Sequence, residues 1–222
     1  MKLKMLLGLF YLLFSCSVMG YVDAVWQPGY AVKSGIKIVL FGIIPFFILL
    51  KLTSTNFATM FQVKWPSVWR SALLGIAIYM IIVGGYFLLR ELIDFSNITT
   101  SLNDSVGVNA SNFIFVAMYI SIVNSFLEEF FFRGFGYTLL KSRGRTFAYT
   151  ICSILFALYH VAMMIGWYDW WIFGLALLAL FGTGIIFHIL NDRSGTIYTS
   201  WIVHMCSNLG INTVGFILFG II

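Results

Sequence analysis

The chain has 222 residues, of which 61% are hydrophobic and only 9% are charged, and its formal net charge is +5. A soluble domain carries about 25% charged residues, so this composition excludes a soluble globular protein and indicates an integral membrane protein. The charge is small and spread along the chain, which argues against a nucleic-acid-binding surface, and the long unbroken apolar runs exclude a β-barrel.

Seven apolar segments are long enough to cross a bilayer, which requires about 20 helical residues. They cover about 5–22, 36–52, 71–89, 113–139, 147–166, 171–190 and 197–220. We expect the first to be an uncleaved span rather than a signal peptide, because hydrophobic spans continue after it. The fourth is longer than one crossing needs, so we expect it to tilt or to end at the interface. The predicted fold class is all-α, a polytopic transmembrane helical bundle of about seven spans.

Basic residues are distributed unevenly between the two sides of this bundle. With the N-terminus in the cytoplasm, nine of them lie at cytoplasmic ends: Lys2, Lys4, Lys51, Lys64, Arg70, Lys141, Arg143, Arg145 and Arg193. The outer side then holds Lys33, Lys37 and Arg90. Because cytoplasmic loops carry the excess of lysine and arginine, the predicted topology is N-inside and C-outside.

Two adjacent carboxylates, Glu128 and Glu129, lie inside the fourth apolar segment. A charged side chain at the bilayer centre costs at least about 2.5–3.5 kcal/mol, so an intramembrane ionisable residue indicates a functional site. Glu129 and Arg133 are four residues apart on one helix face and can pair. Glu128 points about 100° away from Glu129 and is predicted to face a cavity.

Helical rise places other polar residues at the depth of Glu128. At about 1.5 Å per residue from the predicted cytoplasmic edge, Glu128 and His160 lie roughly 20 and 21 Å deep. His204 and Asn208, one helical turn apart, lie roughly 14 and 20 Å deep. His188 lies near the cytoplasmic end of its span and is predicted to be interfacial. One layer of three different helices therefore holds the candidate site.

These residues form three ordered motifs, which are Glu128–Arg133 as E-E-x-x-x-R, Phe156–His160 as F-x-x-x-H and His204–Asn208 as H-x-x-x-N. The turn Asn191–Ile197 precedes the last one. Together they resemble the CPBP family of intramembrane proteases, which includes CAAX proteases and bacteriocin-processing Abi enzymes. The resemblance covers roughly 113–215. We therefore expect one membrane domain over 1–222, with three N-terminal spans and an outer loop in 1–112 and the catalytic core in 113–215.

The resemblance implies an intramembrane endopeptidase that hydrolyses a membrane-associated or lipidated peptide. Glu128 would activate the attacking water with the assistance of His160. His204 and Asn208 would complete the site, as a metal ligand and its neighbour or as an oxyanion hole. Glu129, paired with its arginine, would brace the helix as structural support.

The resemblance leaves the use of a metal open, because the family is described both as metalloproteases and as metal-free glutamate proteases. The compact zinc motif H-E-x-x-H is absent. If a metal is used, zinc held by His160, His204 and Glu128 would match the common set of two histidines and a carboxylate. The expected cofactor is therefore zinc or none.

Two other functions fit parts of the pattern. A non-proteolytic bacteriocin-immunity protein or scaffold could retain the fold, but a scaffold has no need of Glu128. A proton or ion transporter could use buried glutamate and histidine as a relay, but it would spread polar residues through the full membrane depth. The expected partners are the lipid bilayer and a membrane-embedded or lipidated peptide, with no nucleic acid. The small size favours a bacterial plasma membrane.

Overall fold

The computed structural model describes residues 2–53, 57–165, 167 and 169–222, and all regular secondary structure within them is helical. Seven helical segments are long and apolar enough to cross a membrane. They are Lys2–Trp26, Tyr30–Leu52, Trp65–Leu89, Phe113–Arg143, Arg145–Met164, Trp170–Ser194 and Tyr198–Leu218. The predicted all-α bundle of seven spans is thus confirmed, and the N-inside orientation stays a prediction.

Several spans are built from more than one helical piece. The first two consist of α1 (Lys2–Tyr21), η1 (Val22–Trp26), α2 (Tyr30–Lys37), η2 (Ile38–Ile43) and α3 (Ile44–Leu52). The short helix η3 (Phe57–Phe61) leads to α4 (Trp65–Leu89) and α5 (Ser96–Val106). The fourth span consists of α6 (Phe113–Met118), η4 (Tyr119–Asn124), α7 (Ser125–Glu128), η5 (Glu129–Gly136), α8 (Tyr137–Leu140) and η6 (Lys141–Arg143). The last three are α9 (Arg145–Met164), α10 (Trp170–Ser194) and α11 (Tyr198–Leu218).

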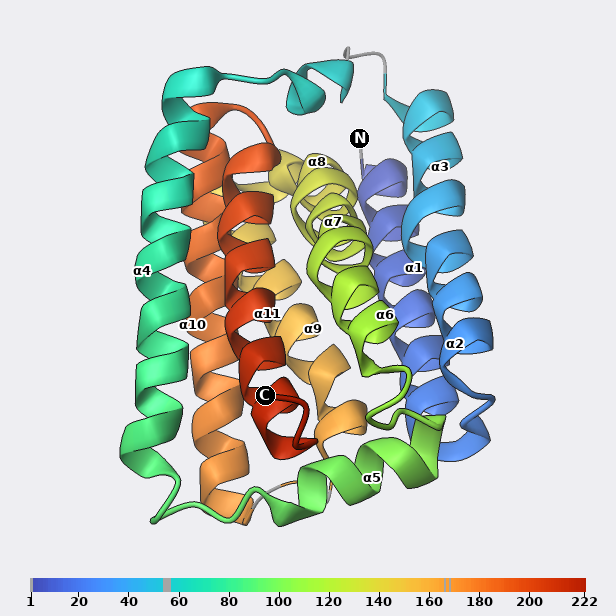
Figure 1. Ribbon diagram of the computed structural model, residues 1–222. Coiled ribbons are helices and arrows are strands. Elements are labelled where there is room, and N and C mark those ends of the chain that lie inside the picture. The colour runs from blue at the N-terminus through green and yellow to red at the C-terminus, as the bar shows by residue number, and fades with distance from the viewer. Residues whose placement is uncertain (1, 54–56, 166, 168) are drawn as a thin grey trace.

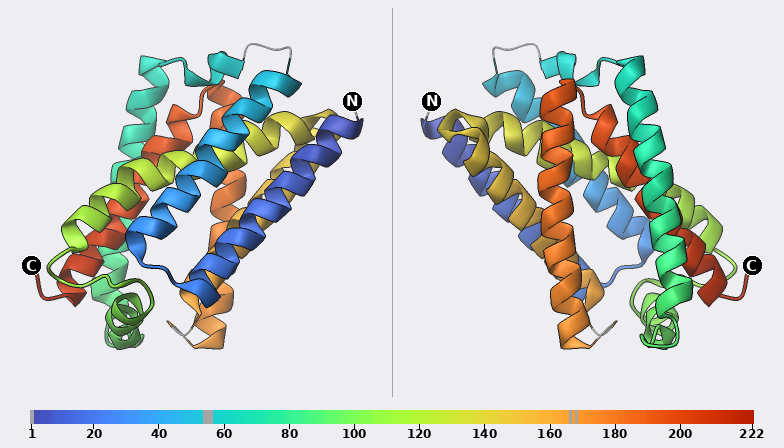
Figure 2. Two further views of the ribbon diagram at one scale, coloured as in Figure 1. Left: turned by 90° about the vertical axis from the view of Figure 1, so that its right-hand side faces the viewer. Right: turned by 90° about the vertical axis from the view of Figure 1, so that its left-hand side faces the viewer.

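The spans run alongside one another, and α5 lies across the end of the bundle opposite the N-terminus (Figure 1). The predicted outer loop therefore contains a helix. Asp94 accepts a hydrogen bond from the backbone N–H of Ser96 at the start of α5, and Gly107 ends it in the left-handed conformation. The side views show α1 and α9 lying side by side at a tilt (Figure 2).

Small residues bring the helices together. A Cβ added to Gly75 on α4 would lie 2.7 Å from Sγ of Cys206 on α11. A Cβ on Gly184 of α10 would lie 2.8 Å from Cβ of Ser153 on α9. Glycine at such contacts is typical of membrane helix interfaces, where packing rather than water exclusion drives association.

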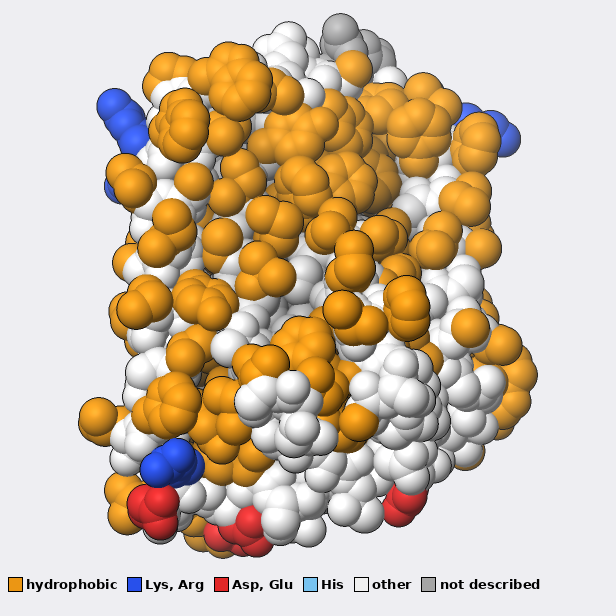
Figure 3. All heavy atoms as spheres, in the orientation of Figure 1, with side chains coloured by type: hydrophobic (Ala, Val, Ile, Leu, Met, Phe, Trp, Pro, Cys, Tyr) orange, Lys and Arg blue, Asp and Glu red, His pale blue; other side chains and the backbone are white. Residues whose placement is uncertain are grey.

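The molecular surface matches a bilayer environment. Hydrophobic side chains cover the middle of the face in Figure 3, and the charged side chains on that face lie towards its upper and lower margins. In a soluble protein an apolar surface of this extent would be a liability. In a bilayer these hydrophobic side chains contact lipid hydrocarbon, so the liability does not arise.

A cluster of phenylalanines holds the second and fourth spans together. Phe41 of η2 stacks on Phe131 of η5, with ring centroids 4.0 Å apart, and both are fully buried. Phe132 also packs edge-on against Phe41 and against Phe156 of α9. The cluster fixes α2, which precedes Phe41, relative to the helix that carries the two glutamates.

The second span begins at Tyr30, six residues before the predicted boundary. Gly29, with φ of 84°, breaks the preceding turn, and the helix begins directly after it. Lys33 and Lys37 therefore lie within the helix and are buried, with 9% and 3% of their surfaces exposed. Each contacts a buried carboxylate that the sequence did not assign to it, which is Asp23 for Lys33 and Glu128 for Lys37, and their predicted place on the outer side stays a prediction.

Candidate active site

Glu128 lies at the centre of the buried polar group and is 1% exposed. Its Oε1 accepts hydrogen bonds from Nζ of Lys37 at 2.5 Å and from Nδ2 of Asn124 at 3.0 Å. Its Oε2 is buried and accepts no hydrogen bond from the described residues. One oxygen of this carboxylate is therefore anchored, and the other is available.

Two histidines from two other helices face the available oxygen. Nε2 of His160 on α9 lies 3.8 Å from Oε2 of Glu128, and Nε2 of His204 on α11 lies 3.6 Å from it. The structure thus brings together three of the residues that the depth count placed in one layer. Three helices distant in sequence converge on this point.

Hydrogen bonds to the other ring nitrogens determine the histidine tautomers. Nδ1 of His160 lies 2.7 Å from the carbonyl oxygen of Phe156, and Nδ1 of His204 lies 2.8 Å from Oε1 of Glu129. Both partners are acceptors, so both Nδ1 atoms donate. In a neutral imidazole the opposite nitrogen then carries a lone pair. Two lone pairs and Oε2 of Glu128 therefore face one another, and this cluster of acceptors requires a hydrogen donor.

Glu129 has the bracing position that its spacing predicted. Its Oε1 accepts hydrogen bonds from Nη1 of Arg133 at 3.1 Å and from His204, and its Oε2 accepts one from Oγ of Ser200 at 2.5 Å. The paired side chains of Glu129 and Arg133 are fully buried. This carboxylate connects the fourth span to α11 and orients the ring of His204.

Asn208 lies one turn beyond His204 and contacts a different partner. Its Nδ2 donates to the backbone carbonyl of Ile120 at 3.1 Å. Ile120 belongs to the π-helical segment η4, in which carbonyl groups depart from the regular α-helical pattern. Asn208 therefore anchors α11 to the fourth span in this structure, and its predicted role in the reaction stays a prediction.

Lys37 is the site residue that sequence reasoning missed. Its ammonium group contacts Asn124 and Glu128 and lies 4.7 Å from the centroid of the Tyr159 ring. The sequence did contain a signal for its depth. Lys37 lies 15 residues before Leu52, a separation that corresponds to roughly 22 Å along a helix. That is close to the depth counted for Glu128, but Lys37 stood at the edge of the span predicted over 36–52 and was therefore assigned to the outer side.

His188 is buried, with only 2% of its surface exposed, and its predicted place at the membrane interface stays a prediction. Its ring stacks on Tyr149 with centroids 4.9 Å apart. It lines a separate polar cavity next to Arg133, and the lining of that cavity includes neither Glu128 nor the two histidines of the site.

The predicted zinc site at Glu128 stays a prediction, to which the geometry gives no direct support. Among the described residues, no three histidine, cysteine or acidic side chains are grouped so that they could hold a metal ion. The carboxylate that would serve as a ligand already carries the ammonium group of Lys37 on its other oxygen. The ammonium group of Lys37 therefore supplies a positive charge next to Glu128.

Residues 110–210 match the family model described as Type II CAAX prenyl endopeptidase Rce1-like. The matched segment contains all three motifs, so the match confirms the resemblance to the CAAX and CPBP proteases. No curated protein and no solved structure matches the chain. The family match and the seven spans together support a multi-pass membrane protein with peptidase activity.

Proposed function

We propose that the protein is an intramembrane endopeptidase in which Glu128 activates the attacking water. The observation that carries this proposal is the buried, unpaired Oε2 of Glu128, which faces the lone pairs of His160 and His204. Water is a hydrogen donor that can satisfy such a group of acceptors. A water held there is also next to a carboxylate that can take its proton.

Lys37 keeps this base in its reactive form. An isolated carboxylate in a low-dielectric interior becomes neutral, because burial disfavours the charged state. The ammonium group 2.5 Å from Oε1 provides the counter-charge for Glu128. The pair also leaves Oε2 unobstructed, so Glu128 stays ionised while its second oxygen binds water.

Peptide hydrolysis next requires a proton for the leaving amine and stabilisation of the developing oxyanion. Protonated Glu128 can return its proton to the amine. The buried ammonium of Lys37 is the positive charge beside Glu128, whereas the two imidazoles present Nε2 lone pairs and can donate to an oxyanion only after they take up a proton. Asn208 could join them only by exchanging its hydrogen bond to the carbonyl of Ile120.

The substrate class follows from the location of the site. The catalytic group lies within helices that span the membrane, so a peptide must reach it from the bilayer or its interface. A membrane-associated or lipidated peptide meets that requirement, since its anchor concentrates it there. The side chain of His160 is 14% exposed against 2% for Glu128, which favours approach from the α9 side.

The test is cleavage of lipidated and unlipidated peptides by purified protein in liposomes. We expect Glu128→Gln to lower turnover by about 10²–10⁴, the usual contribution of a general base. Glu91→Gln is the matched control, because it makes the same change at an exposed carboxylate outside the spans, and we expect no loss. Wild-type turnover from a folded Glu128→Gln protein would refute the assignment. A wild type that binds peptides without cleaving them would favour the scaffold function.

A further inference from the structure

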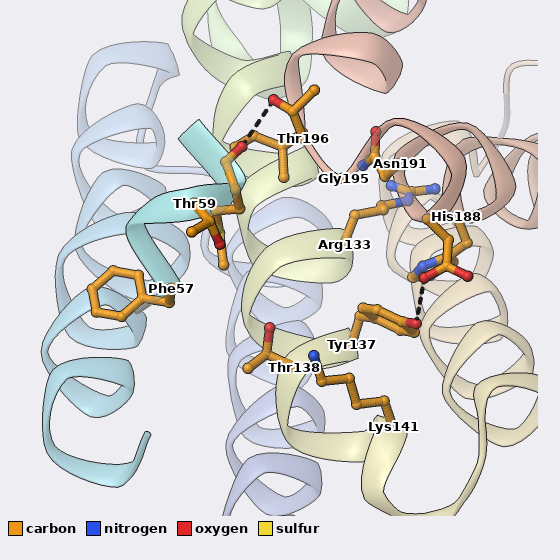
Figure 4. Close-up of a pocket in the computed structure, with 13 residues that line it drawn as sticks. Phe57, Thr59, Arg133, Tyr137, Thr138, Lys141, His188, Asn191, Gly195 and Thr196 are labelled. Carbon is orange, nitrogen blue, oxygen red and sulfur yellow. Dashed lines mark hydrogen bonds between the residues drawn. The ribbon is translucent and has the colours of Figure 1, made fainter. Parts of the chain in front are cut away.

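A polar cavity of about 200 Å³ lies beyond Arg133, between η3, the η5–α8 segment, α10 and the turn that follows α10. Figure 4 shows Arg133, Tyr137 and Lys141 along one helix, with His188 and Asn191 of α10 beside them. This cavity is large enough for several waters or one small polyatomic ion. The peptidase proposal makes no use of it.

Arg133 presents an unused pair of donors at this cavity. Its Nη1 is bound to Glu129, while Nε and Nη2 are buried and have no hydrogen-bond partner among the described residues. The ring centroids of Phe156 and Phe187 lie 4.2 and 5.2 Å from its guanidinium carbon. Nε and Nη2 share one edge of the guanidinium plane, the edge that binds an oxyanion with two parallel hydrogen bonds.

Two side chains of α10 add further buried polar groups without partners. Nε2 of His188 and Nδ2 of Asn191 are also buried and lack partners in the described chain. The other end of the Asn191 amide is occupied, since its Oδ1 accepts hydrogen bonds from Oγ1 of Thr199 and from N of Ser200. Asn191 is therefore held in one orientation, with its NH₂ group unused.

The charges at the cavity favour an anion. Lys141 is exposed and lines the cavity, and it forms no ion pair with the described residues. The one carboxylate in the lining, Asp192, is already bound by Arg145 at 3.0 Å and by the hydroxyl of Tyr137 at 2.8 Å. The unsatisfied groups of Arg133 and Asn191 are thus donors, Nε2 of His188 donates in the tautomer that carries its proton there, and the unpaired charge is positive.

We propose that this cavity is a binding site for a small oxyanion of the phosphate type, held by the free edge of Arg133 together with His188 and Asn191. Buried donors without hydrogen-bond partners destabilise a fold. An oxyanion offers several acceptor atoms and would supply those partners. The phosphate group can come from free inorganic phosphate or from the headgroup of an anionic lipid.

The test is thermal unfolding of the purified protein in detergent during a titration with inorganic phosphate at constant ionic strength. We expect a saturable rise in the midpoint for the wild type, because a ligand that binds the folded state stabilises it. Asn191→Asp keeps the acceptor for Thr199 and Ser200 but replaces the donor with a negative charge. We expect it to weaken phosphate binding by at least about tenfold.

Two further variants make the test specific. Lys141→Gln should weaken binding by up to about fivefold, as expected for an exposed charge. Arg143→Gln removes the same charge two residues away, outside the cavity lining, and should leave the affinity unchanged. If Asn191→Asp does not fold, His188→Phe serves instead, because it retains a ring to stack on Tyr149 and removes the Nε2 donor.

A second arm distinguishes the two sources of phosphate. The protein is reconstituted in phosphatidylcholine nanodiscs with or without phosphatidylglycerol, in the absence of free phosphate. Stabilisation by phosphatidylglycerol that Asn191→Asp removes, without a response to inorganic phosphate, would identify a lipid headgroup. No wild-type response in either arm would overturn the proposal and leave a water-filled cavity. Equal responses from wild type and Asn191→Asp would also overturn it, since binding would then lie elsewhere.

Discussion

Replacing Lys37 with methionine tests whether this lysine is the counter-charge of Glu128. The two side chains are 2.5 Å apart, with only 3% and 2% of their surfaces exposed. Removing one partner of a buried ion pair costs about 3–5 kcal/mol, because it leaves an uncompensated charge. Since 1 kcal/mol shifts Tm by about 2–4 °C in a domain of 150–250 residues, we expect Lys37→Met to lower Tm by about 6–20 °C.

The double variant Lys37→Met/Glu128→Gln tests whether the lost stability comes from the uncompensated charge of Glu128. Removing both charges of a buried pair is often nearly neutral, so the second substitution should restore at least about half of the lost stability. Peptidase turnover should stay absent, because the base is gone. The seven tryptophans of the chain provide a fluorescence signal for unfolding in detergent.

Lys33→Met is the matched control for this experiment. Lys33 lies one turn earlier on α2 and forms a buried pair with Asp23, also at 2.5 Å. It should lose comparable stability yet keep turnover at low temperature, because its partner is not Glu128. The reasoning would be refuted if Lys37→Met melted within about 2 °C of the wild type. It would also be refuted if the double variant lost the sum of the two single losses.

Three further predictions follow from the site. Glu129→Gln should lower both Tm and turnover, since it weakens the hydrogen bonds that hold His204 and Ser200, whereas Ser200→Ala should cost only about 1 kcal/mol in denaturant unfolding. His160→Ala and His204→Ala should each lower turnover by about 10²–10⁴ at saturating peptide, and wild-type rates in either would exclude that histidine from the reaction. Dialysis against a zinc chelator should leave turnover unchanged, and a loss that added zinc restores would show that a metal is used.

Much of the site could be predicted because helical rise and turn are nearly constant. Fixed rise placed Glu128, His160 and His204 in one layer, and the four-residue spacing paired Glu129 with Arg133. These relations depend on local geometry alone. The rise and spacing relations hold even though the fourth span contains two π-helical segments, which the sequence did not predict.

Contacts between distant residues could not be predicted in this way. Lys37 and Glu128 are 91 residues apart, and the amide of Asn208 finds a carbonyl 88 residues away. A lysine near the end of an apolar run usually lies at the interface, so the charge pattern alone placed Lys37 outside. Only the packing of α2 against the fourth span puts a carboxylate within its reach. The pair of Asp23 and Lys33 is a second buried ion pair that the sequence did not predict.

The different surroundings of the two neighbouring carboxylates assign their functions. Both oxygens of Glu129 accept hydrogen bonds from protein groups, and the side chain is fully buried. Glu128 is equally buried, but half of its hydrogen-bonding capacity is unused. A structural carboxylate would be expected to fill both oxygens, because an unmet buried acceptor costs stability. Oε2 of Glu128, which accepts no hydrogen bond from the described residues, lies where His160 and His204 also present lone pairs. The loss of stability from buried acceptors without donors is therefore concentrated at a single point. Such a point is what a water nucleophile and its base require.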